Sequence, residues 1–234
     1  MDEKPRLLSV IDCGTLEFDR ALELQESLVS RTLAGDSTDY LLLLTHPPVV
    51  TLGRSATAVD EAMAEALSER GIAVRRIRRG GRATYHSPGQ IVGYPIVALE
   101  PVRRDLHAYL RALEGAIVDA LGAFGIDGHG VEEKTGVWVD GSKVASIGVC
   151  VRSWVTYHGF SLNLTEEGLP PAGMDPCGLK PTEMGSLEGL GRSVARDELQ
   201  CKLGHAVAAR LSRNARFGQL EELLTNSVKS GMMV

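Results

Sequence analysis

The stretch of sequence that decides the fold occupies residues 75–90 and reads RRIRRGGRATYHSPGQ. It places five arginines within eight positions and follows them with Gly-Gly and Pro-Gly pairs. A helix is excluded, because glycine costs backbone entropy and proline removes an amide donor. Glycine allows close approach of the backbone, and arginine supplies charge and forked donors. The stretch predicts a loop near an anionic or carbonyl-bearing group, and a solvated turn between strands is the alternative.

Composition predicts one soluble globular domain over residues 1–234. Hydrophobic residues make up 44% of the chain and charged residues 24%, as in ordinary globular proteins. The net charge of -5 argues against a nucleic-acid partner, which would call for a basic excess. An acidic chain with one arginine cluster instead predicts a partner that brings negative charge to that cluster.

Targeting signals and cysteine usage predict a cytoplasmic protein without membrane contact. The N-terminal MDEKPRLLSV contains acidic residues and lacks the apolar core of a signal peptide. The four cysteines are far apart and form no CxxC pair, which is typical of free thiols in a reducing compartment. They are Cys13, Cys150, Cys177 and Cys201.

Apolar periodicity predicts an α+β fold, an α/β sheet domain whose mixed, largely antiparallel sheet is covered by helices. Helical spacing recurs at residues 16–33, 60–70, 105–124 and 195–211. Short extended runs predict strands at residues 7–13, 40–45, 49–52, 72–77, 91–99, 145–151 and 154–164. Asp140-Gly141 suits a type I′ hairpin turn. The region 169–193 is rich in proline and glycine and predicts irregular structure.

Cys177 is the first candidate for covalent chemistry. Pro176 before it and Gly178 after it predict that the thiol lies on a tight turn. The other three thiols fall in predicted strands or a helix, where a small buried hydrophobe is the usual role. Cys177 is therefore a candidate nucleophile, and an inert loop thiol is the alternative.

Lys143 is the second candidate. It follows the Asp-Gly turn and begins an apolar strand, where a lysine is normally exposed and protects a sheet edge. If it is buried in a pocket, its ammonium would favour a neighbouring thiolate or move a proton. His46, His86 and His158 are further candidates for a base, a hydrogen-bond donor or a packed polar residue.

Motifs for metal and nucleotide binding are absent from the sequence. It contains no HExxH and no zinc-type spacing of cysteine and histidine, so no metal is expected. It contains no GxxxxGK[ST] phosphate loop, and Gly80-Gly81 is too short for a dinucleotide fingerprint. These absences favour covalent chemistry on a thiol.

Three separated blocks resemble the lipoyl(octanoyl) transferase family. The first combines HPPVVTLGR at residues 46–54 with RGGRATYHSPGQ at residues 79–90. The second combines KVASIGV at residues 143–149 with YHGFSLNL at residues 157–164, and the third is DPCGL at residues 175–179. The blocks follow the family's order over most of the chain, which makes the resemblance specific.

The resemblance implies the fold of biotin and lipoate protein ligases and no cofactor. It implies octanoyl transfer from acyl-carrier protein to a lysine of lipoyl domains, in 2-oxoacid dehydrogenase complexes or the glycine cleavage H protein. Cys177 would be the acyl-accepting nucleophile, and Lys143 would lower the thiol pKa or move protons. The residues implied to bind the acyl substrate are Arg79, Gly80, Gly81, Arg82, Ala83, Thr84, Tyr85, His86, Ser146, Ile147, Gly148, Gly159, Phe160 and Ser161.

Two rival functions remain open at the level of sequence. An ATP-dependent lipoate or biotin protein ligase shares the arginine-glycine stretch and the fold, but it would not require a cysteine. A non-catalytic module that binds lipoyl domains or carrier proteins would bind without turnover. We also expect Arg75 and Arg76 to offer a docking face for an acidic carrier protein.

Overall fold

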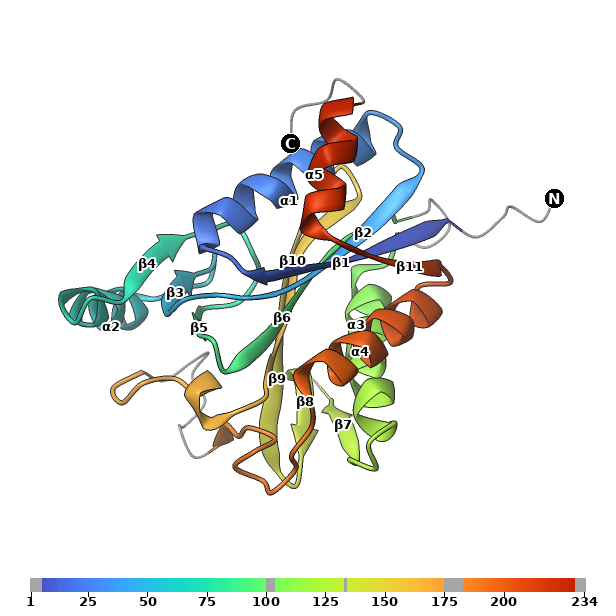
Figure 1. Cartoon of the computed structure of the whole chain (residues 1–234). Helices are drawn as coiled ribbons and strands as arrows, with labels where there is room; N and C mark the ends of the chain where they lie inside the picture. Colours follow the sequence, from blue (N-terminus) through green and yellow to red (C-terminus); the bar gives the residue numbers. More distant parts are fainter. Residues whose placement is uncertain (1–5, 100–103, 133, 175–182, 230–234) are drawn as a thin grey trace.

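A computed structural model describes residues 6–99, 104–132, 134–174 and 183–229 of the chain. Its main feature is a sheet with the strand order β11-β1-β2-β6-β10-β9-β8-β7 (Figure 1). In that order the strands are β11 (Asn214–Gln219), β1 (Leu7–Thr15), β2 (Thr38–Thr45), β6 (Gln90–Ile96), β10 (Val155–Asn163), β9 (Ser142–Arg152), β8 (Lys134–Val139) and β7 (Gly128–Val131). The pairs β11-β1 and β1-β2 are parallel and the other pairs are antiparallel. The predicted fold class is confirmed.

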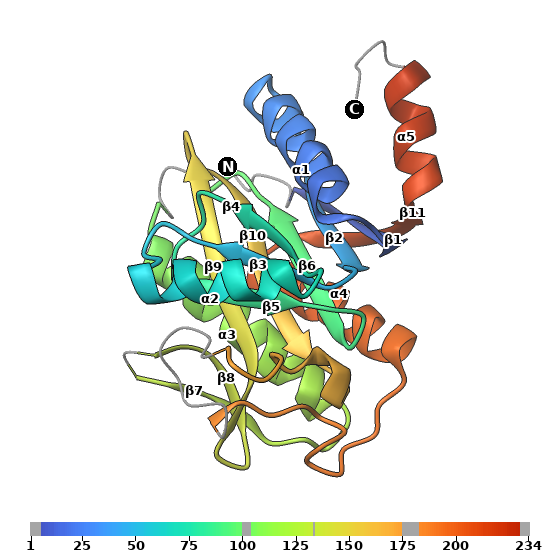
Figure 2. The same cartoon turned by 90° about the vertical axis from the view of Figure 1, so that its left-hand side faces the viewer.

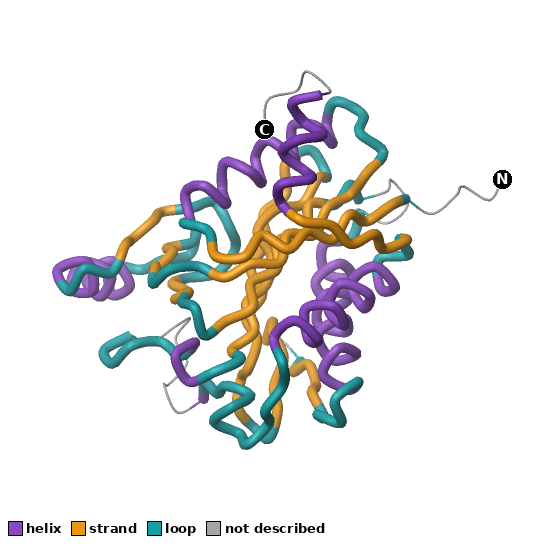
Figure 3. Tube along the Cα trace, in the orientation of Figure 1, coloured by secondary structure: helices purple, strands orange, loops and turns teal. Residues whose placement is uncertain are grey.

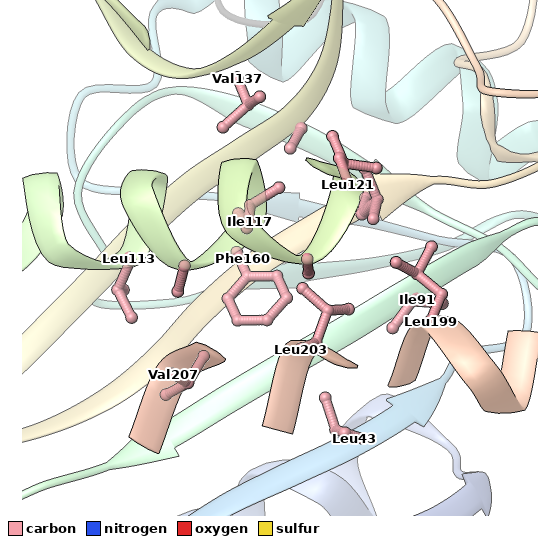
Figure 4. Packing of buried hydrophobic residues seen from close by; sticks show 14 of the residues in the cluster. Leu43, Ile91, Leu113, Ile117, Leu121, Val137, Phe160, Leu199, Leu203 and Val207 are labelled. Carbon is pink, nitrogen blue, oxygen red and sulfur yellow. The ribbon is translucent and has the colours of Figure 1, made fainter. Parts of the chain in front are cut away.

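Helices cover both faces of this large sheet (Figure 3). Helices α1 (Phe18–Leu33) and α5 (Leu220–Lys229) pack on one face, and α3 (Leu106–Gly122) and α4 (Arg196–Arg210) pack on the other. Successive side chains of a strand point to opposite faces of the sheet. All four leucines in the run of β2 are therefore buried, because helices cover both faces. Leu41 and Leu43 contribute to the core under α3 and α4, and Leu42 and Leu44 to the core under α1. Figure 4 shows Leu43 beside the residues of α3 and α4.

A second, smaller sheet is a feature that the sequence did not predict. It has the order β4-β3-β5, from β4 (Ala73–Arg76), β3 (Val49–Leu52) and β5 (Ala83–His86). Figure 2 shows this sheet and α2 (Ala58–Glu69) in front of the large sheet. Its core contains Val50 and Leu52 from β3 and Leu67 from α2. The arginine-glycine stretch begins in β4 and ends after β5, so it joins the two edge strands of the small sheet.

Two tight turns build the long hairpins of the large sheet. Asp140 and Gly141 have φ angles of 49° and 81°, as a type I′ turn requires, so the predicted hairpin is confirmed. Ser153 and Trp154 have φ angles of 48° and 65° and join β9 to β10 in the same way. After β10, the short 3-10 helix η2 (Glu166–Gly168) precedes Met174.

Structure after residue 211 was also absent from the sequence-based expectation. There β11 and α5 follow α4, and β11 lies at the edge of the sheet with mostly exposed side chains. Its six residues include only two apolar side chains with more than a hydrogen atom, Ala215 and Phe217, so the alternation is too short to predict a strand. Within the residues described, no helix combines the length and apolar character needed to cross a membrane.

Candidate active site

A cavity of about 500 Å³ lies between the large and small sheets. Strands β9 and β10 of the large sheet form one wall, and the residues between β4 and β5 form another. Leu106 and Leu110 of α3 and Phe18 of α1 add apolar surface. The volume is within the range of roughly 300–1,000 Å³ that small-molecule sites occupy.

Most of the residues that the family resemblance implied do line this cavity. They are Arg79, Gly80, Gly81, Thr84, His86, Ser146, Ile147, Gly148, Gly159, Phe160 and Ser161. Their contact with a substrate stays a prediction.

Arg82, Ala83 and Tyr85 are not among the residues that line this cavity, although Ala83 and Tyr85 line a smaller neighbouring pocket that Lys143 shares. In β5 the side chains alternate, so Thr84 and His86 face the cavity and Ala83 and Tyr85 pack toward the core of the small sheet. The guanidinium of Arg82 binds the carboxylate of Asp60, with Nε 2.9 Å from Oδ2. The alternation of a strand that the sequence did not predict is the physical reason for this difference.

Lys143 lies in the cavity wall and is only 6% exposed, so the buried alternative is correct. Its Nζ is 5.1 Å from the centre of the Trp138 ring, which is a cation–π distance. The two residues are paired across β8 and β9. The carbonyl of Lys143 accepts the N–H of Gly185 at 3.0 Å, and Met184 forms a parallel bridge with Lys143. The chain downstream of residue 182 therefore returns to Lys143.

Arg79 is a buried cation that binds carbonyl groups of the protein itself. Its Nη2 donates to the backbone O of Thr51 at 2.7 Å and to the hydroxyl of the same residue at 2.8 Å. The N–H of Gly80 donates to the carbonyl of Val149 at 3.0 Å, which ties the loop to β9. Glycine is required at residue 53, because an added Cβ would lie 2.4 Å from the carbonyl O of Gly81. The predicted close approach to carbonyl groups is thus made within the protein.

Three histidines and a tyrosine form a buried cluster beside Arg79. His46 donates from Nδ1 to the carbonyl of Leu16 at 2.6 Å, so its Nε2 accepts the hydroxyl of Tyr94 at 2.8 Å. Burial lowers the pKa of His46 and of His158 to about 4. Burial, together with the charge of Arg79, holds the pKa of His86 well below its usual value. All three imidazoles are therefore neutral at pH 7.

His158 adopts a left-handed backbone conformation with a φ of 56°, which is unusual for a residue other than glycine. Its N–H donates to Oε1 of Gln25 on α1 at 2.8 Å, and Gln25 is fully buried. Such strain is most often found at functional sites. No sequence signal marked Gln25 or Tyr94, since both look like ordinary residues of a helix and a strand.

Cys177 lies outside the described residues. Among the described thiols, Cys13 is buried in β1, and this burial raises its pKa to about 12. Cys150 is partly buried in β9, whereas Cys201 is exposed on α4. The expectation of a buried thiol at Cys201 was wrong, because helical periodicity alone did not fix which face of α4 meets the sheet. Among the described residues, no group of three or more His, Cys, Asp or Glu side chains is placed to hold a metal ion.

Comparison with known proteins identifies the family. The model of the lipoyl protein ligase A/B catalytic domain matches residues 17–207. The chain belongs to this family. The lipoyl protein ligase A/B domain of this chain is 45% identical over 188 residues to an octanoyltransferase of Geobacter metallireducens, a match that covers 80% of this chain and 85% of the relative.

Solved structures of lipoate and biotin protein ligases share the fold. A putative lipoate protein ligase of T. acidophilum superposes with a TM-score of 0.72 at 18% identity, and the match covers 97% of this chain and 95% of the other. A biotin protein ligase from Aquifex aeolicus superposes with a TM-score of 0.55 at 12% identity and covers 87% and 70% of the two chains. The expected relation to the lipoate and biotin protein ligase folds is therefore confirmed.

Proposed function

We propose that this chain transfers an octanoyl group from acyl-carrier protein to a lysine of a lipoyl domain. A thioester on Cys177 carries the group between the two proteins. The acceptors are the lipoyl domains of 2-oxoacid dehydrogenase complexes or the glycine cleavage H protein. The name of the octanoyltransferase relative supports octanoyl as the transferred group. The main structural observation in favour of this active site is that Lys143 is buried in the wall of a cavity.

The described residues on either side of the Cys177 segment are compatible with this assignment. Met174 is 1% exposed and belongs to the core of the small sheet, and Met184 is paired with Lys143. Cys177 is three positions after the first and seven before the second. The cavity is lined by residues of the same small sheet.

The chemistry consists of two exchanges at one sulfur atom. The Cys177 thiolate attacks the carbonyl carbon of the donor thioester, the C–S bond to the carrier arm breaks, and the released thiolate takes up a proton. The neutral amine of the acceptor lysine then attacks the acyl-enzyme, the C–S bond to Cys177 breaks, and an amide forms as the amine loses a proton. A lysine ammonium beside the thiol favours its thiolate. We assign to Lys143 this role and the transfer of the proton.

The cavity can take up the apolar chain. Ile147, Phe160 and Leu110 contribute apolar surface, and the neighbouring His86 and His158 are neutral at pH 7. Neutral imidazoles cost less to leave in contact with an alkyl chain than charged ones, because no charge loses its hydration. The entrance of the cavity is positively charged, because Arg54 and Lys134 line the cavity and are exposed.

Arg54 and Lys134 are better candidates for docking the donor than Arg75 and Arg76. In the structure Arg75 binds Asp19 in a two-point ion pair at 2.6 Å, and Arg76 binds Glu61. Among the described residues, no ion pair involves Arg54 or Lys134. Cations at the entrance that pair with no described acid favour a partner with phosphate and carboxylate groups, as a carrier protein with its phosphopantetheine arm has.

The test that separates this function from its rivals measures transfer to a lipoyl domain with and without ATP. We expect octanoyl-carrier protein to serve as donor without ATP, and Cys177→Ala to abolish transfer. Cys201→Ala is the matched control, because it removes an exposed thiol from α4. A lipoate ligase, the activity named for the T. acidophilum structure, would instead use free octanoate with ATP and tolerate Cys177→Ala. A binding module would show no turnover with either donor.

A further inference from the structure

A buried carboxylate lies behind the strand that carries the candidate active-site lysine. Glu114 is on α3, only 4% exposed, among apolar residues such as Leu113 and Ile117. A carboxylate in such a place must be compensated by hydrogen bonds or an opposite charge. Arg111, one helical turn earlier and half exposed, supplies the charge. This ion pair does not by itself explain why the carboxylate is directed inward.

The second partner of Glu114 is the backbone of β8. Its Oε1 accepts the N–H of Gly136 at 2.9 Å, and the bond is buried. Gly136 has a φ of 141°, a conformation that residues with a side chain rarely adopt. The register between β8 and β9 also shifts next to it, between Val137 and Trp138. Glu114 therefore holds an irregular segment of β8 in place.

That segment packs directly on the end of Lys143. A Cβ at residue 136 would lie 2.5 Å from Cε and 3.2 Å from Nζ of Lys143. Two residues further along β8, the ring of Trp138 lies 5.1 Å from the same Nζ. The ammonium of Lys143 is thus enclosed by the backbone of Gly136 and by the Trp138 ring. Glu114 binds the first of these two walls and brings a negative charge behind it.

We propose that Glu114 is a positioning residue for Lys143 in acyl transfer. It acts through the Gly136 amide, which fixes the wall against which the lysine packs, and through its charge, which favours the ammonium form. Among the described residues, the charged and titratable groups that line the cavity with this lysine are Arg54, Arg79, His86, Tyr94, Lys134 and His158. Arg111 on α3 pairs with Glu114 itself. Glu114 is the one acid whose carboxylate binds the backbone wall of the lysine in the described part of the chain. The inference depends on the proposed function of Lys143.

The experiment compares Glu114→Gln and Glu114→Leu with the wild-type chain in single-turnover formation of the acyl-enzyme. The glutamine keeps an oxygen that can accept the Gly136 N–H but removes the charge, and the leucine removes both. We expect Glu114→Leu to slow acylation by about tenfold to a hundredfold, the range that a hydrogen bond to a charged group carries. Glu114→Gln should recover part of that loss and displace the pH–rate profile toward lower pH, since the lysine ammonium loses a favourable charge. KM for the donor should change little in both variants.

Asp119→Asn is the matched control, because Asp119 is on the same helix and pairs with Arg210 at the surface, 44% exposed. It should leave the rate unchanged. A second measurement, the rate at which acetic anhydride labels Lys143 in the folded protein, should change in both Glu114 variants and remain as in the wild type in Asp119→Asn. Lowered thermal stability with unchanged labelling and an unchanged rate per folded molecule would overturn the positioning role. If Lys143→Gln keeps full activity while labelling still responds to Glu114, the proposed role of Lys143 fails and the structural coupling stands.

Discussion

The ammonium of Lys143 lies 5.1 Å from the centre of the Trp138 ring, and both side chains are only 6% exposed. The ring faces the ammonium with its electron-rich π surface, which stabilises a cation where little water reaches it. This pair therefore links the packing of the hairpin β8-β9 to the charge of the candidate active-site lysine.

Replacing Trp138 by leucine should slow acyl-enzyme formation. A desolvated cation–π contact is worth up to ~2 kcal/mol, so we expect a decrease in rate of about threefold to thirtyfold. Trp138→Phe should keep most of the rate because the ring remains. Trp154→Leu is the control, since Trp154 forms the same contact with Arg104 at the surface, 39% exposed. Equal rates for Trp138→Leu and Trp154→Leu would argue against the contact.

Substituting alanine for Gly136 should damage both stability and activity. The new Cβ would lie 2.5 Å from the carbonyl O of Ala145 as well as from Cε of Lys143, at a φ of 141°. We expect the free energy of unfolding to fall by about 2–3 kcal/mol, measured by urea denaturation, and the acylation rate to fall with it. Gly122→Ala, at the end of α3, should instead be neutral or stabilising because nothing lies within 4 Å of that Cβ.

Acid should destabilise the protein through the buried histidines before its carboxylates titrate. The pKa of His46 and of His158 falls from 6.5 to about 4 on folding, so the unfolded chain binds more protons than the folded chain between these values. Their contribution to stability is complete above pH 6.5 and is lost as the pH falls toward 4, by up to ~1.4 kcal/mol per pH unit for each group. His158→Asn, which tolerates a left-handed backbone, should reduce the slope by one proton. An unchanged slope in urea denaturation across this interval would contradict the assignment.

The docking of the donor should depend on the entrance of the cavity. Arg54→Glu and Lys134→Glu should raise KM for octanoyl-carrier protein about tenfold at low salt, with a smaller effect at high ionic strength. Arg75→Gln should leave KM unchanged, because that side chain already binds Asp19. If instead Arg75→Gln raised KM and the two entrance variants did not, Arg75 would be part of the docking face, as the sequence predicted. Steady-state kinetics at two salt concentrations makes the comparison.

Sequence alone predicts the periodic parts of this fold and little of its irregular parts. The four leucines of β2 form a run typical of a strand that is buried on both faces, and the apolar stripe along α3 is typical of a helix that packs on a sheet. Both patterns can be recognised without coordinates. Strands were predicted near β3 and β4, but their pairing with β5 into a separate sheet could not be anticipated, because β5 is only four residues long and follows a loop of glycines and arginines. The mostly exposed strand β11 has only Ala215 and Phe217 at alternate apolar positions, which is too short a pattern to predict a strand.

The candidate site was predictable as a set of residues but not as a geometry. The family resemblance brought Lys143 and the cavity-lining stretch around His86 together, although they are far apart in the chain. It could not tell which side chains of β5 face the cavity, since this depends on the alternation of a strand that was not expected. Gln25 and Glu114 are helix residues whose side chains accept buried hydrogen bonds from backbone N–H groups of strands β10 and β8. Such contacts leave no local mark in the sequence.

Intact mass spectrometry shows whether Cys177 carries the acyl group between donor and acceptor. The chain is mixed with octanoyl-carrier protein without ATP or acceptor, quenched in acid, weighed, and mapped by proteolysis. We expect a mass increase of one octanoyl group, located on Cys177, sensitive to hydroxylamine, and lost when an apo lipoyl domain is added. An unmodified chain that still transfers octanoate, or a label on another residue that the lipoyl domain discharges, would contradict it.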